Sequence, residues 1–183
     1  RKLSERRRAL VRVAPDVAEP LGIVAKSPPM GRLVDLARRV AKVDSTVLIT
    51  GGASGIGAAL ARGLAARGAF VAIADRQIDV ARAMAADLAR IGTGASAHEL
   101  DVRDQAAAHA LVAELSDRHG GIDYVFANAG TGVGGEALEY TDDDWRYIVD
   151  VNLMGVIHLF HAAYPRMAAK RSGHLIATAS MAG

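Results

Sequence analysis

The chain has 183 residues, of which 51% are hydrophobic and only 4% aromatic, a length and composition that suit one globular domain with a sizeable core. It contains no cysteine, which excludes disulfide bonds, a thiolate nucleophile and a cysteine-based zinc site, and no apolar run approaches the roughly 20 residues of a membrane span. The net charge of +2 is unevenly placed, because residues 1–45 carry 11 Lys/Arg and 5 Asp/Glu whereas residues 46–183 carry 11 and 15.

Residues 1–45 form the basic part of the chain. Prolines interrupt the stretch from Arg1 to Pro29, which predicts a linker. From Met30 to Ala41 the apolar residues fall on one helical face, opposite the charged ones, which predicts an amphipathic helix. A basic run as short as the one at the start of the chain is typical of a solvated helix, so nucleic acid is not expected as a partner.

From residue 46 onward, short apolar runs alternate with helical patterns. The runs are TVLIT (46–50), AFVAIAD (69–75), YVFANAG (124–130) and HLIATAS (174–180), with a weaker strand at SAHEL (96–100). Helical spacing covers 60–68, 80–91, 106–119 and one long stretch from 142 to about 170. This alternation predicts an α/β domain over 46–183, with a doubly wound parallel sheet that binds ligands at the carboxyl ends of its strands.

The stretch VLITGGASGIGAAL, from Val47 to Leu60, runs from a strand through glycines into a helix, the arrangement that holds phosphate groups. A P-loop for nucleoside triphosphates requires Lys and Ser/Thr after its last glycine, but Ala58 and Ala59 occupy those positions. The glycine spacing instead matches a Rossmann-type turn, in which the backbone approaches the pyrophosphate of a dinucleotide. The residues expected to bind it are Thr50, Gly51, Gly52, Ser54, Gly55, Ile56 and Gly57.

The second predicted strand ends in Asp75, 18 residues after Gly57. A carboxylate at this place accepts hydrogen bonds from the adenosine ribose hydroxyls and repels a 2′-phosphate, so NAD is the expected cofactor. Arg76 follows directly and favours a phosphorylated cofactor, which keeps NADP as the alternative.

Further motifs, in order, make residues 46–183 resemble a classical short-chain dehydrogenase/reductase. TGGASGIG matches the cofactor turn of that family, and LDV, ANAG, VNLMG and ATASMAG match its later motifs, although Ala127 replaces the first Asn of NNAG. The resemblance implies cofactor contacts from the first two of these later motifs and catalytic roles from the last two. The residues concerned are Asp101, Val102, Asn128, Ala129 and Gly130 for the cofactor, and Asn152 and Ser180 for catalysis.

The resemblance implies hydride transfer between an alcohol or carbonyl substrate and nicotinamide, in a homo-oligomer. The lack of cysteine suits the reducing cytoplasm, and the lack of a long apolar run predicts no membrane partner. The family's general acid/base is a Tyr in Tyr-x-x-x-Lys, roughly a dozen residues after the Ser, whereas Gly183 ends this sequence and no Tyr within it precedes a Lys by four. We therefore expect a truncated chain with a sheet incomplete at its C-terminal side, able to bind cofactor with little or no turnover. A non-catalytic dinucleotide-binding or oligomerisation module is the alternative.

Residues 20–50 resemble a different family, the sigma-54-dependent enhancer-binding activators of the AAA+ class, at the segment leading into their Walker A loop. KSPPM before an amphipathic helix and the strand STVLITG carry this likeness, although Ala25 replaces a Gly. It implies a hybrid chain with a junction within 46–51. No Walker B acid cluster or GAFTGA loop follows, so an ATP-dependent regulator fragment is the least favoured function.

Other groupings of polar residues are interpreted as structural. His158 and His161 are expected to be ordinary helix residues and no metal site is expected, since no carboxylate pair accompanies them. A hydrolase triad of Ser180 with His174 and Asp150 lacks the GxSxG elbow. The acidic run TDDDW, from 141 to 145, has the spacing of a capping box at a helix start.

Overall fold

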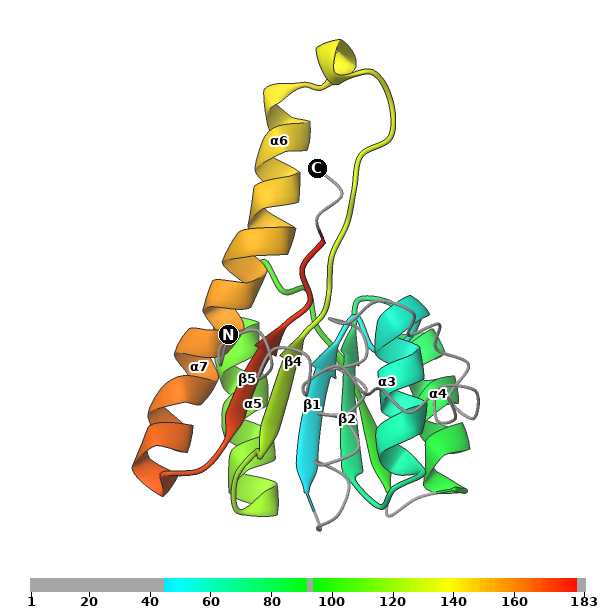
Figure 1. Cartoon of the computed structure of the whole chain (residues 1–183), viewed down its shortest axis with the longest axis vertical. Helices are drawn as coiled ribbons and strands as arrows, with labels where there is room; N and C mark the ends of the chain where they lie inside the picture. Colours follow the sequence, from blue (N-terminus) through cyan, green and yellow to red (C-terminus); the bar gives the residue numbers. More distant parts are fainter. Residues whose placement is uncertain (1–44, 92–93, 181–183) are drawn as a thin grey trace, which may run out of the picture.

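The computed structural model describes residues 45–91 and 94–180, which form a five-stranded parallel sheet in the order β3-β2-β1-β4-β5 (Figure 1). The order confirms the predicted doubly wound α/β fold. β1 pairs with both β2 and β4. The chain adds β2 and β3 on one side of β1 and then reverses to add β4 and β5 on the other side, so the reversal lies between β1 and β4. Ligands in such sheets bind outside the carboxyl ends of the strands at this reversal. The strands are β1 (Thr46–Thr50), β2 (Phe70–Asp75), β3 (Ala95–Glu99), β4 (Tyr124–Ala127) and β5 (His174–Ala177).

Helices cover both faces of the sheet. On one face α3 (Gly55–Ala65) packs on β1 and β2 and α4 (Ile78–Ala89) on β2 and β3, and Val47 and Ile49 of β1 belong to the same buried cluster. On the other face α5 (Gln105–His119) and α7 (Gly155–Lys170) pack with Leu48 in a second cluster. Successive residues of a strand point to opposite faces, so these continuous apolar runs supply both cores.

The helix expected from 142 to 170 is one continuous helical stretch of three parts. It begins with α6 (Asp142–Val149), passes through the π-helical turn η3 (Asp150–Met154) and continues as α7. The predicted capping box is confirmed, because Thr141 Oγ1 accepts from the Asp144 amide at 3.2 Å and Asp144 Oδ2 accepts from the Thr141 amide at 2.9 Å. α6 projects beyond the carboxyl edge of the sheet, together with the loop that carries η2 (Ala137–Glu139) (Figure 1).

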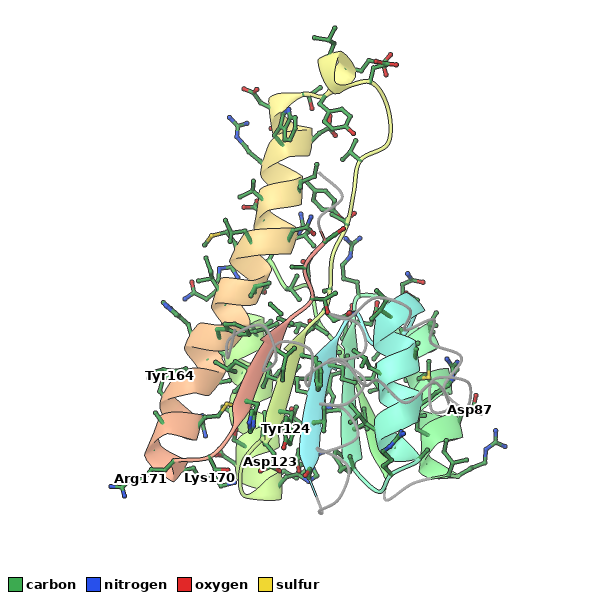
Figure 2. The ribbon with its side chains drawn as sticks, viewed as in Figure 1. Asp87, Asp123, Tyr124, Tyr164, Lys170 and Arg171 are labelled. Carbon is green, nitrogen blue, oxygen red and sulfur yellow. The ribbon has the colours of Figure 1, made fainter. Side chains whose placement is uncertain are left out.

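The amino edge of the sheet is fixed by local polar contacts. Asp123 Oδ2 accepts from the Thr46 amide at 2.9 Å, and Tyr124 stacks on the ring of His174 with centroids 4.9 Å apart. Figure 2 shows Asp123 and Tyr124 at the start of β4, at the opposite end of this strand from α6. These contacts set the register of β1, β4 and β5.

The differences from the predicted elements are ones of extent. The strands predicted at 124–130 and 174–180 end at Ala127 and Ala177, because the next residues turn into loops whose polar groups bond each other. The helix predicted from Leu60 begins at Gly55, inside the glycine turn. The expected linker, amphipathic helix and AAA+ resemblance fall almost wholly on residues 1–44, outside the described residues, and with the hybrid junction stay predictions.

The close packing of α7 on the loop after β3 generates a stability prediction. A Cβ at Gly155 would lie 2.6 Å from Cγ2 and 2.9 Å from Cβ of the buried Val102. Overpacking of this kind costs about 1–3 kcal/mol, so Gly155→Ala is expected to lower the free energy of unfolding in urea by that amount. Gly132→Ala is the control, because nothing lies within 4 Å of its Cβ position. Equal losses in the two variants would contradict the packing.

Candidate functional site

The Thr50 hydroxyl joins the carboxyl ends of β1 and β4. Its Oγ1 donates to the Phe126 carbonyl at 3.3 Å and accepts from the amides of Asn128 at 3.1 Å and Ala129 at 3.2 Å. Thr50 is 1% exposed, so these bonds satisfy groups that water does not reach. The hydroxyl uses its donor and both acceptor positions, and so fixes the loop after β4 against the start of the glycine turn.

The Asn128 side chain extends this network to the glycine turn and to β5. Its Nδ2 donates to the carbonyls of Thr50 at 3.2 Å and Gly51 at 3.4 Å, and its Oδ1 accepts from Thr178 Oγ1 at 3.0 Å. Three strand ends are therefore tied to one amide. We refer to Thr50, Asn128 and Thr178 as the strand-end network.

The glycine turn leaves no room for side chains where it folds back on itself. Gly51 and Gly55 have positive φ angles of 62° and 51°. A Cβ at Gly57 would lie 2.2 Å from the Gly51 carbonyl oxygen and 2.7 Å from Asn128 Nδ2. The Ser54 side chain makes no cap hydrogen bond at the start of α3, and no acidic residue occupies its first turn. The first amides of α3 thus remain open to an anion.

Asp75 ties the end of β2 to the same turn. Its Oδ2 accepts from the Ala53 amide at 3.1 Å and its Oδ1 from the Gln77 amide at 3.0 Å. A carboxylate offers about four lone-pair positions, so two remain for a ligand. Asp75, which the sequence predicts as a ligand of the ribose, therefore holds the turn and also lines the cleft beside it.

A cleft of about 700 Å³ lies along this edge of the sheet. Most of the residues predicted to bind cofactor line it. They are Gly51, Ser54, Gly55, Ile56, Asp75, Arg76, Asp101, Val102, Asn128, Ala129 and Gly130. Thr50, Gly52 and Gly57 are not among the lining residues, and they shape the cleft from beneath: Thr50 through its hydrogen bonds, and Gly52 and Gly57 through close backbone contacts.

Asp101 is held in its charged form at the cleft. Arg103 Nη2 donates to Asp101 Oδ2 at 2.6 Å, and Arg103 Nε donates to both carboxylate oxygens. These hydrogen bonds lower the pKa of Asp101 below its usual value. The Arg103 guanidinium also lies over the ring of Tyr147, with its Cζ 5.1 Å from the centroid.

The two residues predicted to be catalytic lie outside the lining of the cleft. Asn152 sits in the π-helical turn, where its Oδ1 accepts from the Thr131 amide and its Nδ2 donates to the Thr131 carbonyl, both at 2.8 Å. π-Turns inside helices are frequent at functional sites. Ser180 is exposed, three residues after β5. Asn152 thus holds the loop that follows Gly130, directly beside the cleft.

Several lining residues were not predicted from the sequence. They are Gln77, Leu100, Thr131, Tyr147, Val151 and Thr178. Most are neighbours of predicted residues, so extending each motif by one or two positions finds them. Tyr147 is different, because it lies on α6 outside the motifs recognised in the sequence. The course of the long helix brings it to the cleft.

The described residues show neither a metal site nor a membrane-spanning helix. Within 45–91 and 94–180, no three His, Asp or Glu side chains are grouped so as to hold a metal ion. His158 Nδ1 instead lies 3.0 Å from the Val102 carbonyl oxygen. Among the helices of the same residues, none is both long and apolar enough to cross a membrane.

This architecture, with its glycine turn and strand-end carboxylate, defines a nucleotide-binding type of α/β protein. A family model described as short chain dehydrogenase matches residues 45–183. The chain belongs to that family.

Relatives and solved structures agree with this assignment. The chain is 36% identical over 140 residues to the meso-2,3-butanediol dehydrogenase of Serratia marcescens and 42% identical over 139 residues to the sorbitol dehydrogenase of Cereibacter sphaeroides, covering 76% and 75% of this chain but 55% and 53% of theirs. It spans about half the length of these curated relatives.

Among solved structures, levodione reductase gives a TM-score of 0.72 at 33% identity, covering 75% of this chain and 55% of that one. A metagenomic short-chain oxidoreductase in complex with NADP gives 0.73 at 31%, covering 78% and 65%.

The strand-end network generates a prediction about stability. Thr50→Val keeps the shape of the side chain but leaves the Asn128 and Ala129 amides without their acceptor, which costs about 1–3 kcal/mol of unfolding free energy. Thr50→Ser retains the hydroxyl and is expected to lose less. Urea unfolding of both variants measures the difference. If Thr50→Val were as stable as Thr50→Ser, the hydroxyl would not be holding these strand ends.

Proposed function

We propose that the cleft binds a nicotinamide dinucleotide and that the chain contributes to an oxidoreductase acting on an alcohol or carbonyl substrate. The main support for this function is that the open amides of α3 and the carboxylate of Asp75 lie in one cleft. The fit to a pyrophosphate is supported by Gly57, where a side chain would collide with the Gly51 carbonyl. NAD(H) is the preferred form and NADP(H) the alternative.

Each part of the cleft has a proposed role along the cofactor. The turn from Gly51 to Gly57 receives the pyrophosphate, because the first amides of α3, where the turn ends, are open to an anion. Asp75 receives the ribose hydroxyls on the lone pairs that Ala53 and Gln77 leave free. Asp101 and Val102 contact the adenine, and the loop from Asn128 to Gly130, fixed by the strand-end network, lies beside the nicotinamide.

The bound nicotinamide supplies the hydride chemistry, and the chain supplies binding and orientation. We propose that Ser180 holds the substrate oxygen and that Asn152 positions the loop beside the cofactor through Thr131. The family's Tyr-x-x-x-Lys pair is not among these 183 residues. Loss of a positioned general acid costs about 10²- to 10⁴-fold in rate, so these residues by themselves are expected to bind cofactor with little turnover.

A homo-oligomer is proposed from the exposed apolar side chains of the long helix. Val149, Leu153 and Tyr164 are 45%, 54% and 64% exposed. Large apolar side chains gathered on one element are typical of surfaces that another protein covers. A second copy of the chain is the proposed partner.

Asp75 gives the sharpest test of the binding mode. Asp75→Ala removes the acceptor for the ribose hydroxyls and is expected to weaken NADH binding by about tenfold or more, measured by titration of NADH fluorescence. Asp79→Ala is the control, because Asp79 is an exposed residue of α4 that pairs with Arg82 and does not line the cleft. An unchanged affinity in Asp75→Ala would remove this residue from the ribose site. Tighter binding of ATP than of NADH by the unaltered chain would overturn the proposed function itself.

A further inference from the structure

Tyr147 lies between two arginines that follow neighbouring strands. Its hydroxyl accepts a hydrogen bond from Arg76 Nη1 at 2.8 Å, and the Arg103 guanidinium covers its ring. Arg76 comes directly after β2 and Arg103 shortly after β3, whereas Tyr147 belongs to α6, which starts 66 residues after Arg76 in the sequence. The contact therefore bridges the cleft from its sheet side to its helix side.

The two arginines at this bridge differ in their carboxylate partners. Arg103 is engaged by Asp101 through three hydrogen bonds from its side chain, and Asp150 on the long helix also attracts it. Arg76 forms no salt bridge among the described residues, although it lies near enough to Asp101 for the two charges to attract, and its hydrogen bond is to the Tyr147 hydroxyl. Among the described residues that line the cleft, Arg76 is the one Lys or Arg.

This position matters because NAD and NADP differ only by a phosphate on the adenosine ribose. Asp75 disfavours that phosphate by like charge, while an adjacent guanidinium favours it. A guanidinium pairs best with phosphate through two parallel N–H donors in its own plane. A hydrogen bond at Nη1 occupies one donor of this rigid plane and restrains the direction in which the other donors point.

We propose that Tyr147 is a specificity-determining residue that favours NAD(H) by engaging the Arg76 guanidinium. The inference rests on the proposed function of the cleft. A 2′-phosphate competes with the Tyr147 hydroxyl for the Nη1 donor of Arg76, whereas NAD(H) has no phosphate at that position and does not compete for it. Asp101, Arg103 and the Tyr147 ring form the support that keeps the hydroxyl in place.

The test is a pair of titrations, with NADH and with NADPH, on the 183-residue chain and its variants, followed by cofactor fluorescence. Tyr147→Phe frees Arg76 and is expected to tighten NADPH binding about 3- to 10-fold, the value of one net hydrogen bond, with NADH binding unchanged. In Arg76→Ala/Tyr147→Phe this gain is expected to disappear. Thermal unfolding of each variant verifies that it is folded.

Tyr164→Phe is the matched control, since Tyr164 is exposed on α7, far along the helix from α6 (Figure 2). A ratio of NADPH to NADH affinity that does not move in Tyr147→Phe overturns the inference while leaving the proposed function intact. Weaker NADPH binding in that variant also overturns it, because Tyr147 would then be presenting Arg76 to the phosphate. If the unaltered chain binds neither cofactor, the proposed function fails as well.

Discussion

The buried hydroxyl of Thr50 is the contact on which the cleft depends. Parallel strands that diverge at a reversal of sheet order leave a gap, and the ends of such strands carry amides and carbonyls with no ladder partner. Thr50 satisfies two amides and one carbonyl at that gap, and Asn128 adds the carbonyls of the turn. Because Thr50 is buried and these groups are partly shielded from water, opening of the gap breaks several hydrogen bonds at once. These hydrogen bonds and the close backbone contacts at Gly51 and Gly57 together hold the edges of the cleft.

The electrostatics of the cleft follow from the same framework. Asp75 is committed to the backbone of the turn and of the loop after β2, and Asp101 to Arg103, so both carboxylates stay in fixed positions. The amides of α3 provide the opposite polarity at the glycine turn. A dinucleotide needs this alternation, with donors at its phosphates and acceptors at its ribose.

Features of the site that are local in sequence were predictable, and features that join distant segments were not. The glycine spacing predicted the turn at Gly57, and the spacing of Thr141 and Asp144 predicted the helix start. The position of Tyr147 at the cleft was not predicted, because its partner Arg76 lies 71 residues away in the sequence and no motif links the two. The strands that end at Ala127 and Ala177 were predicted to be longer, since the small residues that follow them resemble strand residues in the sequence. The roles of Asn152 and Ser180 still rest on the family resemblance and stay predictions.

We propose that the carboxyl edge of the sheet is a dinucleotide site. Amide resonances of the isotopically labelled chain, followed during addition of NADH, test it most directly. The resonances of Gly51, Gly55, Ala53 and Gln77 are expected to shift together and saturate, while those around the 260 Å³ cavity lined by Val112, Lys170 and their neighbours stay in place. Shifts confined to that second cavity, or spread evenly over the sheet, would contradict it.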